Sequence, residues 1–254
     1  MCRTGPAPNH VQSSPSSAAR KDRPATLADR PRRTERNVLR RCGLHVAATV
    51  QKGGRTEAAG TIGRHMKPDS SKDFSNSKGL RLHLGGWEVK HGWTIVNVEE
   101  REGVDVRGSC DDLSMFPDGS VAEIYASHVY EHLGYQQELP KALKEAFRVL
   151  MPGGTLMISV PDLDVLCRLF LGTAGDVHAR FHVQRMIMGG QVEPFDFHKT
   201  GFSLDILANF LTHHGFTNIR RVKNFGLFKD TSELVFADVP VSLNVQCMKP
   251  MPAR

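Results

Sequence analysis

The sequence predicts an α/β fold, a doubly wound and mostly parallel sheet, and three neighbouring segments carry this prediction. Residues 121–127 alternate weakly in hydropathy after the turn triplet Pro117-Asp118-Gly119, as a strand does. Residues 139–150 place apolar side chains on one helical face, and residues 155–160 form the apolar run of a covered strand. Two strands joined through a helix make the right-handed crossover from which doubly wound sheets are built.

The remaining elements follow from the same patterns. Further strands are expected over residues 80–84, 94–98, 216–223 and 239–248, and further helices over residues 163–171 and 204–213, the latter capped by Ser203. Residues 172–190 are less regular. The folded domain is therefore expected over residues 79–250.

Residues 1–75 form a basic leader of different composition. Residues 1–72 contain 15 Lys or Arg and 5 Asp or Glu, whereas the remainder of the chain contains 18 and 22. The leader is rich in Ser, Ala, Pro, Gly and Arg and is expected to be disordered, because it offers too little apolar surface to offset its ordering entropy. The basic charge of the whole chain is therefore a property of the leader.

Three interpretations of the leader stay open. Its Arg-rich, acid-poor composition is typical of an organelle transit peptide, so that residues 1–65 would direct import. Residues 30–41 could instead bind nucleic acid or an anionic surface. Alternatively, Met66 is the true start of the protein.

The five cysteines, Cys2, Cys42, Cys110, Cys167 and Cys247, are odd in number, far apart and without zinc spacing. They are interpreted as reduced thiols of a soluble, cytoplasmic protein. No apolar run approaches the length of roughly 20 residues that a membrane span requires. His178 and His182 have an i, i+4 metal-ligand spacing, but no further ligand pattern accompanies them, so a surface or substrate-side helix is expected here and no metal.

The segments PDGSVAEIYASHVYEHL and EAFRVLMPGGTLMISVPD resemble the central part of the S-adenosylmethionine-dependent methyltransferases with a Rossmann-like fold. More closely, residues 79–249 are similar to the methyltransferase type 11 group. These are small predicted methyltransferases that are often associated with sugar and cell-surface metabolism. The resemblance implies S-adenosyl-L-methionine as the cofactor and a final strand that runs antiparallel to the others.

The expected cofactor-binding residues lie at or just after the ends of strands, or in the loop over residues 108–116. They are Leu84, Gly85, Gly86, Glu99, Ser109, Cys110, Asp111 and Ser127. A glycine turn lets backbone approach a ligand, and a carboxylate at the end of the second strand, Glu99 or its alternative Glu100, accepts hydrogen bonds from ribose hydroxyls. The chain departs from the family pattern, which has an acidic residue near the position of His83 and an Asp in place of Ser109. Leu113 and Phe116 are expected to pack the loop that carries Ser109.

Methyl transfer from a sulfonium is an in-line displacement that depends chiefly on positioning. His128 is the candidate base, because it follows a strand end and histidine titrates near neutral pH. Tyr130, His132 and His198 are expected on the acceptor side.

The function predicted is methyl transfer to a small molecule, with a sugar or glycan-related acceptor. The alternative is a catalytically inactive, methyltransferase-like binding protein, which the departures at His83 and Ser109 favour. The net acidic domain argues against a nucleic acid partner, except through the leader. A dinucleotide-dependent dehydrogenase would need a fuller Gly-x-Gly-x-x-Gly fingerprint than this chain has.

Overall fold

The computed structural model describes residues 73–252, and the leader with its three interpretations lies outside this range. The strands are β1 Leu80–Leu84, β2 Thr94–Asn97, β3 Val106–Arg107, β4 Val121–Ser127, β5 Leu150–Pro161, β6 Thr217–Arg221, β7 Val235–Phe236, β8 Val239–Pro240 and β9 Ser242–Met248. The helices are α2 Glu138–Val149, α3 Leu163–Gly172, α4 Val177–Met188 and α5 Leu204–His213, with the 3-10 turns η1 Tyr130–His132 and η2 Thr231–Glu233.

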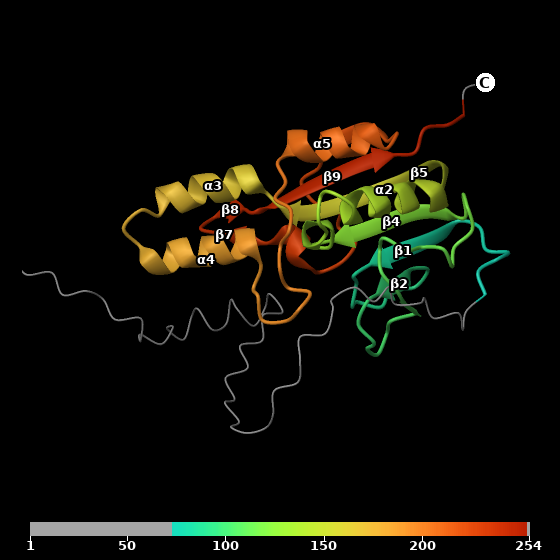
Figure 1. Cartoon of the computed structure of the whole chain (residues 1–254), viewed down its shortest axis with the longest axis horizontal. Coiled ribbons are helices and arrows are strands. Elements are labelled where there is room, and N and C mark those ends of the chain that lie inside the picture. The colour runs from blue at the N-terminus through green and yellow to red at the C-terminus, as the bar shows by residue number, and fades with distance from the viewer. Residues whose placement is uncertain (1–72, 253–254) are drawn as a thin grey trace, which may run out of the picture. The chain divides into compact units, whose positions relative to one another are not determined.

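Seven strands form one twisted sheet in the order β3-β2-β1-β4-β5-β9-β6 (Figure 1). The pairs among β1 to β5 are parallel, and β9 runs antiparallel to both β5 and β6. The smaller strands β7 and β8 pair as a separate antiparallel hairpin. The predicted fold class is confirmed, including its antiparallel final strand.

One face of the sheet carries the main hydrophobic core and is covered by α2 and α5 (Figure 1). Helix α2 buries the stripe Leu139, Ala142, Leu143, Ala146 and Val149, nearly the set that its apolar spacing predicted. On the opposite face, Tyr125 and Met157 pack against Trp93 and Phe228 in a small, largely aromatic cluster. Within residues 73–252, no helix separates β1 from β2 or β2 from β3, so short loops make these two crossovers.

Several predicted boundaries differ from the structure. Strand β5 begins at Leu150, before the Pro-Gly-Gly turn, and the pairing of β4 with β5 shifts register between Val121 and Glu123. The expected strand 239–248 is divided into β8 and β9, and residues 177–188 form the helix α4. Ser203 stands at the N-cap of α5, but its hydroxyl donates to Asp205 and makes no cap hydrogen bond.

Candidate functional site

The loops that follow β1, β2 and β3 are tied together by one residue, Asn97, at the end of β2. Its Nδ2 donates to the Gly86 carbonyl at 3.1 Å, and its Oδ1 accepts from the Glu99 N–H at 3.1 Å. Its own carbonyl accepts from the Gly108 N–H at 2.8 Å. Asn97 is buried, so these hydrogen bonds are shielded from water. Asn97 was not among the residues predicted from the sequence, although a polar side chain at the end of a buried strand was a usable signal.

The glycine turn after β1 is packed by the chain's own side chains. Gly85 has a φ of +69°, and a Cβ at this position would lie 2.5 Å from a methyl of Val129. A Cβ at Gly86 would overlap the imidazole of His83. The two glycines therefore have a packing role in this structure, in addition to the ligand approach that the sequence predicted for them.

His83 lies in the aromatic cluster of the sheet face away from α2. Its ring centroid is 3.9 Å from that of Phe228 and 5.2 Å from that of Tyr125, and its Nδ1 is buried with no hydrogen-bond partner among the described residues. Burial lowers the pKa of His83 to about 4, against the opposing pull of Asp230 and Glu88. The residue at the usual acidic position of the family is thus a neutral packing group.

Of the two carboxylates after β2, Glu99 is the better placed for a ligand at this edge. Its side chain is 28% exposed and lies 2.6 Å from the Arg101 guanidinium, which stacks over the Trp87 ring at 4.1 Å. The side chain of Glu100 is 83% exposed and pairs with Arg107. Glu99 is also the residue whose backbone Asn97 holds.

The loop after β3 is fixed to helix α2. Leu113 and Phe116 are fully buried in the core, which confirms their predicted packing role. Cys110 is buried too, and this burial, followed by the charge of Asp111, raises the pKa of its thiol to about 12. Asp111 pairs with Lys141 of α2 at 3.2 Å. The three residues of this loop that were predicted to bind the cofactor, Ser109 to Asp111, therefore lie on a loop with little freedom.

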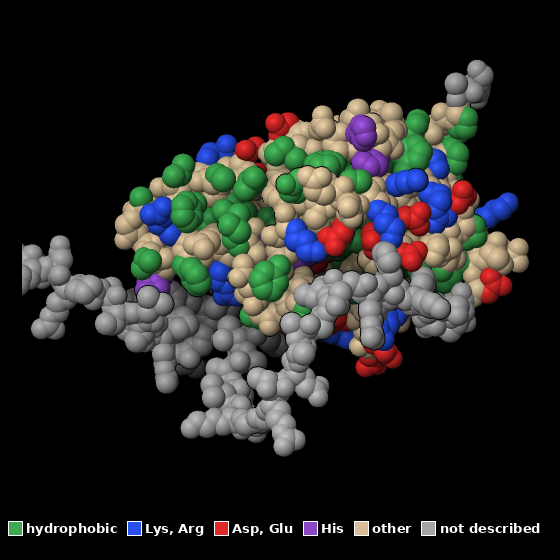
Figure 2. Space-filling model, in the orientation of Figure 1, with side chains coloured by type: hydrophobic (Ala, Val, Ile, Leu, Met, Phe, Trp, Pro, Cys, Tyr) green, Lys and Arg blue, Asp and Glu red, His purple; other side chains and the backbone are tan. Residues whose placement is uncertain are grey.

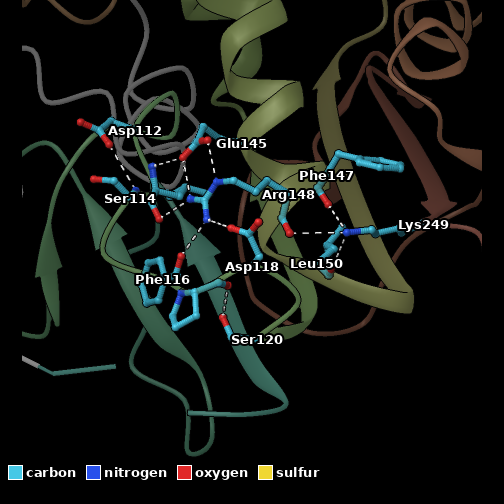
Figure 3. Close-up of polar contacts among 12 residues, drawn as sticks. Asp112, Ser114, Phe116, Asp118, Ser120, Glu145, Phe147, Arg148, Leu150 and Lys249 are labelled. Atoms are coloured by element: carbon cyan, nitrogen blue, oxygen red, sulfur yellow. Dashed lines mark hydrogen bonds and ion pairs between the residues drawn. The ribbon is translucent and has the colours of Figure 1, made fainter. Parts of the chain in front are cut away.

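Arg148 is the main brace of this loop (Figure 3). Its guanidinium donates to both carboxylate oxygens of Glu145 at 2.8 Å, and to the carbonyls of Leu113 and Phe116 at 2.9 and 3.0 Å. It also pairs with Asp118 at 2.7 Å. Hydrogen bonding to Glu145 comes first among the causes that raise its pKa. One side chain thus holds the end of α2 against the whole 113–118 segment.

The end of β4 carries Ser127 and His128, and His128 adopts the uncommon φ of +55°. Its Nδ1 lies 2.9 Å from Glu131 Oε1, and its Nε2 lies 3.1 Å from Ser242 Oγ, whose hydroxyl donates to the Thr231 carbonyl. Both ring nitrogens of His128 are therefore engaged by neighbouring side chains in this arrangement.

Glu131 is almost fully buried, and its carboxyl is surrounded by three histidines. Burial raises its pKa, but the charges and hydrogen bond of His128 and the charges of His132 and His198 outweigh this effect, so the pKa lies below its usual value. The imidazoles of His132 and His198 meet edge to face, 4.9 Å apart between centroids. The structure therefore brings the two predicted acceptor-side histidines together.

Tyr130, which was predicted on the acceptor side together with these two histidines, does not join them. It is fully buried in the main core, and its hydroxyl has no hydrogen-bond partner among the described residues. Burial raises its pKa well above the usual value. Tyr130 packs in the main core and does not line an open surface.

The strand order and the single antiparallel strand define a Rossmann-like methyltransferase fold. Residues 94–158 match the family model described as a methyltransferase domain, in agreement with the resemblance seen in the sequence. No curated protein matches the sequence.

Solved structures of methyltransferases are similar to this chain at low identity. A SAM-dependent methyltransferase from Thermotoga maritima is 19% identical, with 69% of this chain and 84% of that chain covered and a TM-score of 0.44. One from Archaeoglobus fulgidus is 15% identical, with 70% and 88% covered and a TM-score of 0.43. The 1,6-didemethyltoxoflavin-N1-methyltransferase of Burkholderia thailandensis, solved with S-adenosylhomocysteine, is 13% identical, with 68% and 72% covered and a TM-score of 0.43. Because these scores are below 0.5, the fold assignment rests on the strand order of this chain itself.

Within residues 73–252, the helices are all too short or too polar to cross a membrane. The three cysteines of this range, Cys110, Cys167 and Cys247, are free thiols, as predicted. Cys110 and Cys247 are buried, and burial raises the pKa of both.

Proposed function

We propose that the protein transfers a methyl group from S-adenosyl-L-methionine to a small acceptor, a sugar or a glycan-related molecule. The observation that carries this proposal is the sheet order β3-β2-β1-β4-β5-β9-β6. In that order, the ends of β1, β2, β3 and β4 share one edge, where ligands of such sheets bind. The methyltransferase-domain match over residues 94–158 covers three of these four strands.

The residues at this edge fit the adenosine part of the cofactor better than its methionine part. Glu99 is partly exposed and held by Asn97, so its carboxylate is available to two ribose hydroxyls. The loop of Ser109 and Asp111 is braced beside it, where an adenine ring would lie. Bound there, the cofactor would supply an electrophilic methyl group on a sulfonium. The Gly85 turn, by contrast, is filled by Val129, so the methionine part would need a different support.

An exposed apolar surface over α3 and α4 supports an acceptor with an apolar part. Figure 2 shows apolar side chains gathered over α3 and α4, and the most exposed residues of these helices include Leu171, Val177, Phe181 and Met188. Large exposed apolar patches commonly mark binding surfaces. A sugar that carries an apolar group would match this combination. As a proton acceptor for such a hydroxyl, His128 would have to give up one of its two hydrogen bonds when the acceptor binds.

The test is calorimetric titration of the full chain with S-adenosylmethionine and with S-adenosylhomocysteine. We expect micromolar binding that falls about tenfold or more in Glu99→Gln, because an amide replaces the charged acceptor of two ribose hydrogen bonds. The matched control is Glu100→Gln, at the exposed neighbour, which should bind like the wild type.

A folded wild type that binds neither compound would overturn the proposal and favour a second function, a methyltransferase-like binding protein without the cofactor. The observation that supports this alternative is the packing of Val129 and His83 into the glycine turn. If the compounds bind, transfer of a labelled methyl group to sugar acceptors tests the finer part of the proposal.

A further inference from the structure

Three potential metal ligands meet beyond the end of β4. One carboxylate oxygen of Glu131 and one ring nitrogen each of His132 and His198 lie within 4.8 Å of one another. Glu131 and His132 belong to η1, and His198 arrives from the segment between α4 and α5. Two imidazoles and one carboxylate are a donor set that suits divalent transition metals.

The hydrogen bonds of both histidines leave the correct nitrogen for a metal. The Nδ1 of His132 lies 3.2 Å from the Phe197 carbonyl, and the Nδ1 of His198 lies 3.2 Å from the Ile187 carbonyl. A carbonyl oxygen can only accept, so each Nδ1 carries the proton and each Nε2 keeps its lone pair. Ligating histidines in metal sites commonly donate their other N–H in this way, which fixes the tautomer and the ring.

The carboxylate of Glu131 has one oxygen to spare. Its Oε1 forms an ion pair with His128 Nδ1 at 2.9 Å, whereas Oε2 is buried and has neither an ion-pair partner nor a hydrogen-bond partner among the described residues. Glu131 is only 1% exposed, so water does not compensate this oxygen. Buried charged oxygens are normally paired or coordinate a metal, and an oxygen left without either is costly.

The cluster is also held rigidly. The backbone carbonyl of Glu131 accepts from the N–H groups of Lys199 and Thr200 at 2.7 and 3.1 Å. The Thr200 hydroxyl donates to the Leu133 carbonyl at 2.7 Å, and the His198 N–H donates to the Met188 carbonyl at 3.1 Å. These bonds fasten the segment of His198 to η1 on one side and to α4 on the other, so that little ordering remains to be done when an ion binds.

We propose that Glu131 Oε2, His132 Nε2 and His198 Nε2 bind one divalent transition-metal ion of the first row, with Zn²⁺ as the first candidate. His128 then holds the carboxylate from outside the coordination sphere. Three protein ligands leave a coordination position open, the arrangement of sites at which an exogenous oxygen binds. The existence of this site does not depend on methyl transfer.

The test uses the full chain after removal of metal with a chelator, without any methyl donor. Titration calorimetry with Zn²⁺ should give one ion per chain, and Zn²⁺ should raise the melting temperature, because the ion binds the folded state. Substitution with Co²⁺ should produce visible d–d absorption bands without a thiolate charge-transfer band.

The variants His132→Gln and His198→Gln should each lose at least about tenfold in Zn²⁺ affinity, since removal even of an outer partner costs about that much. The matched control is the double variant His178→Gln/His182→Gln, which removes the other histidine pair at a metal-ligand spacing. It should bind like the wild type.

The proposal is overturned if the folded wild type shows no stoichiometric binding. It is equally overturned if the two single variants bind as tightly as the wild type, or if a thiolate band appears, because the ion would then lie on other residues. The Co²⁺ spectrum of the wild type tests for thiolate ligands even when a variant folds poorly.

Discussion

The burial of His83 predicts a specific loss of stability in mild acid. Burial lowers its pKa from 6.5 to about 4, so the folded protein keeps the ring neutral where the unfolded chain protonates it. The unfolded state then binds more protons between these two values, and the free energy of unfolding must fall as the pH drops through this window. Stability associated with His83 is complete above pH 6.5 and is lost progressively toward pH 4.

The magnitude follows from the width of the window. One pKa unit corresponds to about 1.4 kcal/mol, and pH 5 lies about 1.5 units below the unfolded pKa, so the expected loss is about 2 kcal/mol. The assay is urea unfolding at about pH 7.5 and pH 5 with a chelator present, followed by the fluorescence of Trp93, whose ring lies 5.3 Å from that of Phe228 in the same cluster.

The comparison variant is His83→Asn, whose side chain is smaller and does not titrate. The substitution lowers the free energy of unfolding by the same amount at both pH values, so this effect cancels when the two free energies are subtracted. Between about pH 7.5 and pH 5, the variant should therefore lose about 2 kcal/mol less stability than the wild type. Equal losses in the two proteins would refute the inference that His83 is buried in the neutral form.

Three further predictions concern packing and the braces of the site. Gly86→Ala should lower the free energy of unfolding by about 1–3 kcal/mol, because the new methyl group overpacks against His83, and by much less in a His83→Ala background. Equal losses in both backgrounds would contradict the packing role. Arg148→Ala should lower the free energy of unfolding by about 2–4 kcal/mol in chemical denaturation, with Asp118→Asn as a mild control; a loss below the control would disprove the brace. Tyr125→Phe should cost about 1–2 kcal/mol through its lost hydroxyl contacts in the same assay, and the exposed Tyr135→Phe almost nothing.

The sequence predicted those elements whose buried residues recur at the period of a helix or a strand. Helix α2 is an example, because one of its faces packs on the sheet and the other meets water. Helix α4 was predicted only as a surface helix without bounds, because only Val183 is fully buried along it and it packs on α3 and the β7–β8 hairpin. A helix with so narrow a buried stripe leaves little periodic signal.

The ends of strands were predictable as a region, but the roles of single residues were not. The local sequence around Glu131 cannot show that its carbonyl and carboxyl meet Lys199, Thr200 and His198, which are far along the chain. Similarly, the packing of His83 under Gly86 depends on Phe228, from the segment before η2. Such contacts are set by the tertiary fold, and a single sequence carries no spacing rule for them.

The two sides of the sheet edge therefore place different demands on a ligand. At the β1 end, side chains of the protein already fill the space beside both glycines, so a bound group there must displace His83 or Val129 or avoid them. At the β4 end, Glu131 keeps a buried oxygen without a partner, and His132 and His198 keep nitrogen lone pairs beside it. Unsatisfied polar groups in a rigid frame favour binding. Folding has already removed these groups from water, so a ligand supplies the missing polar contacts without a further desolvation of the protein. The β4 end, with its two histidines and buried glutamate, therefore offers polar partners to a ligand, whereas packed side chains occupy the space beside the glycines of the β1 end.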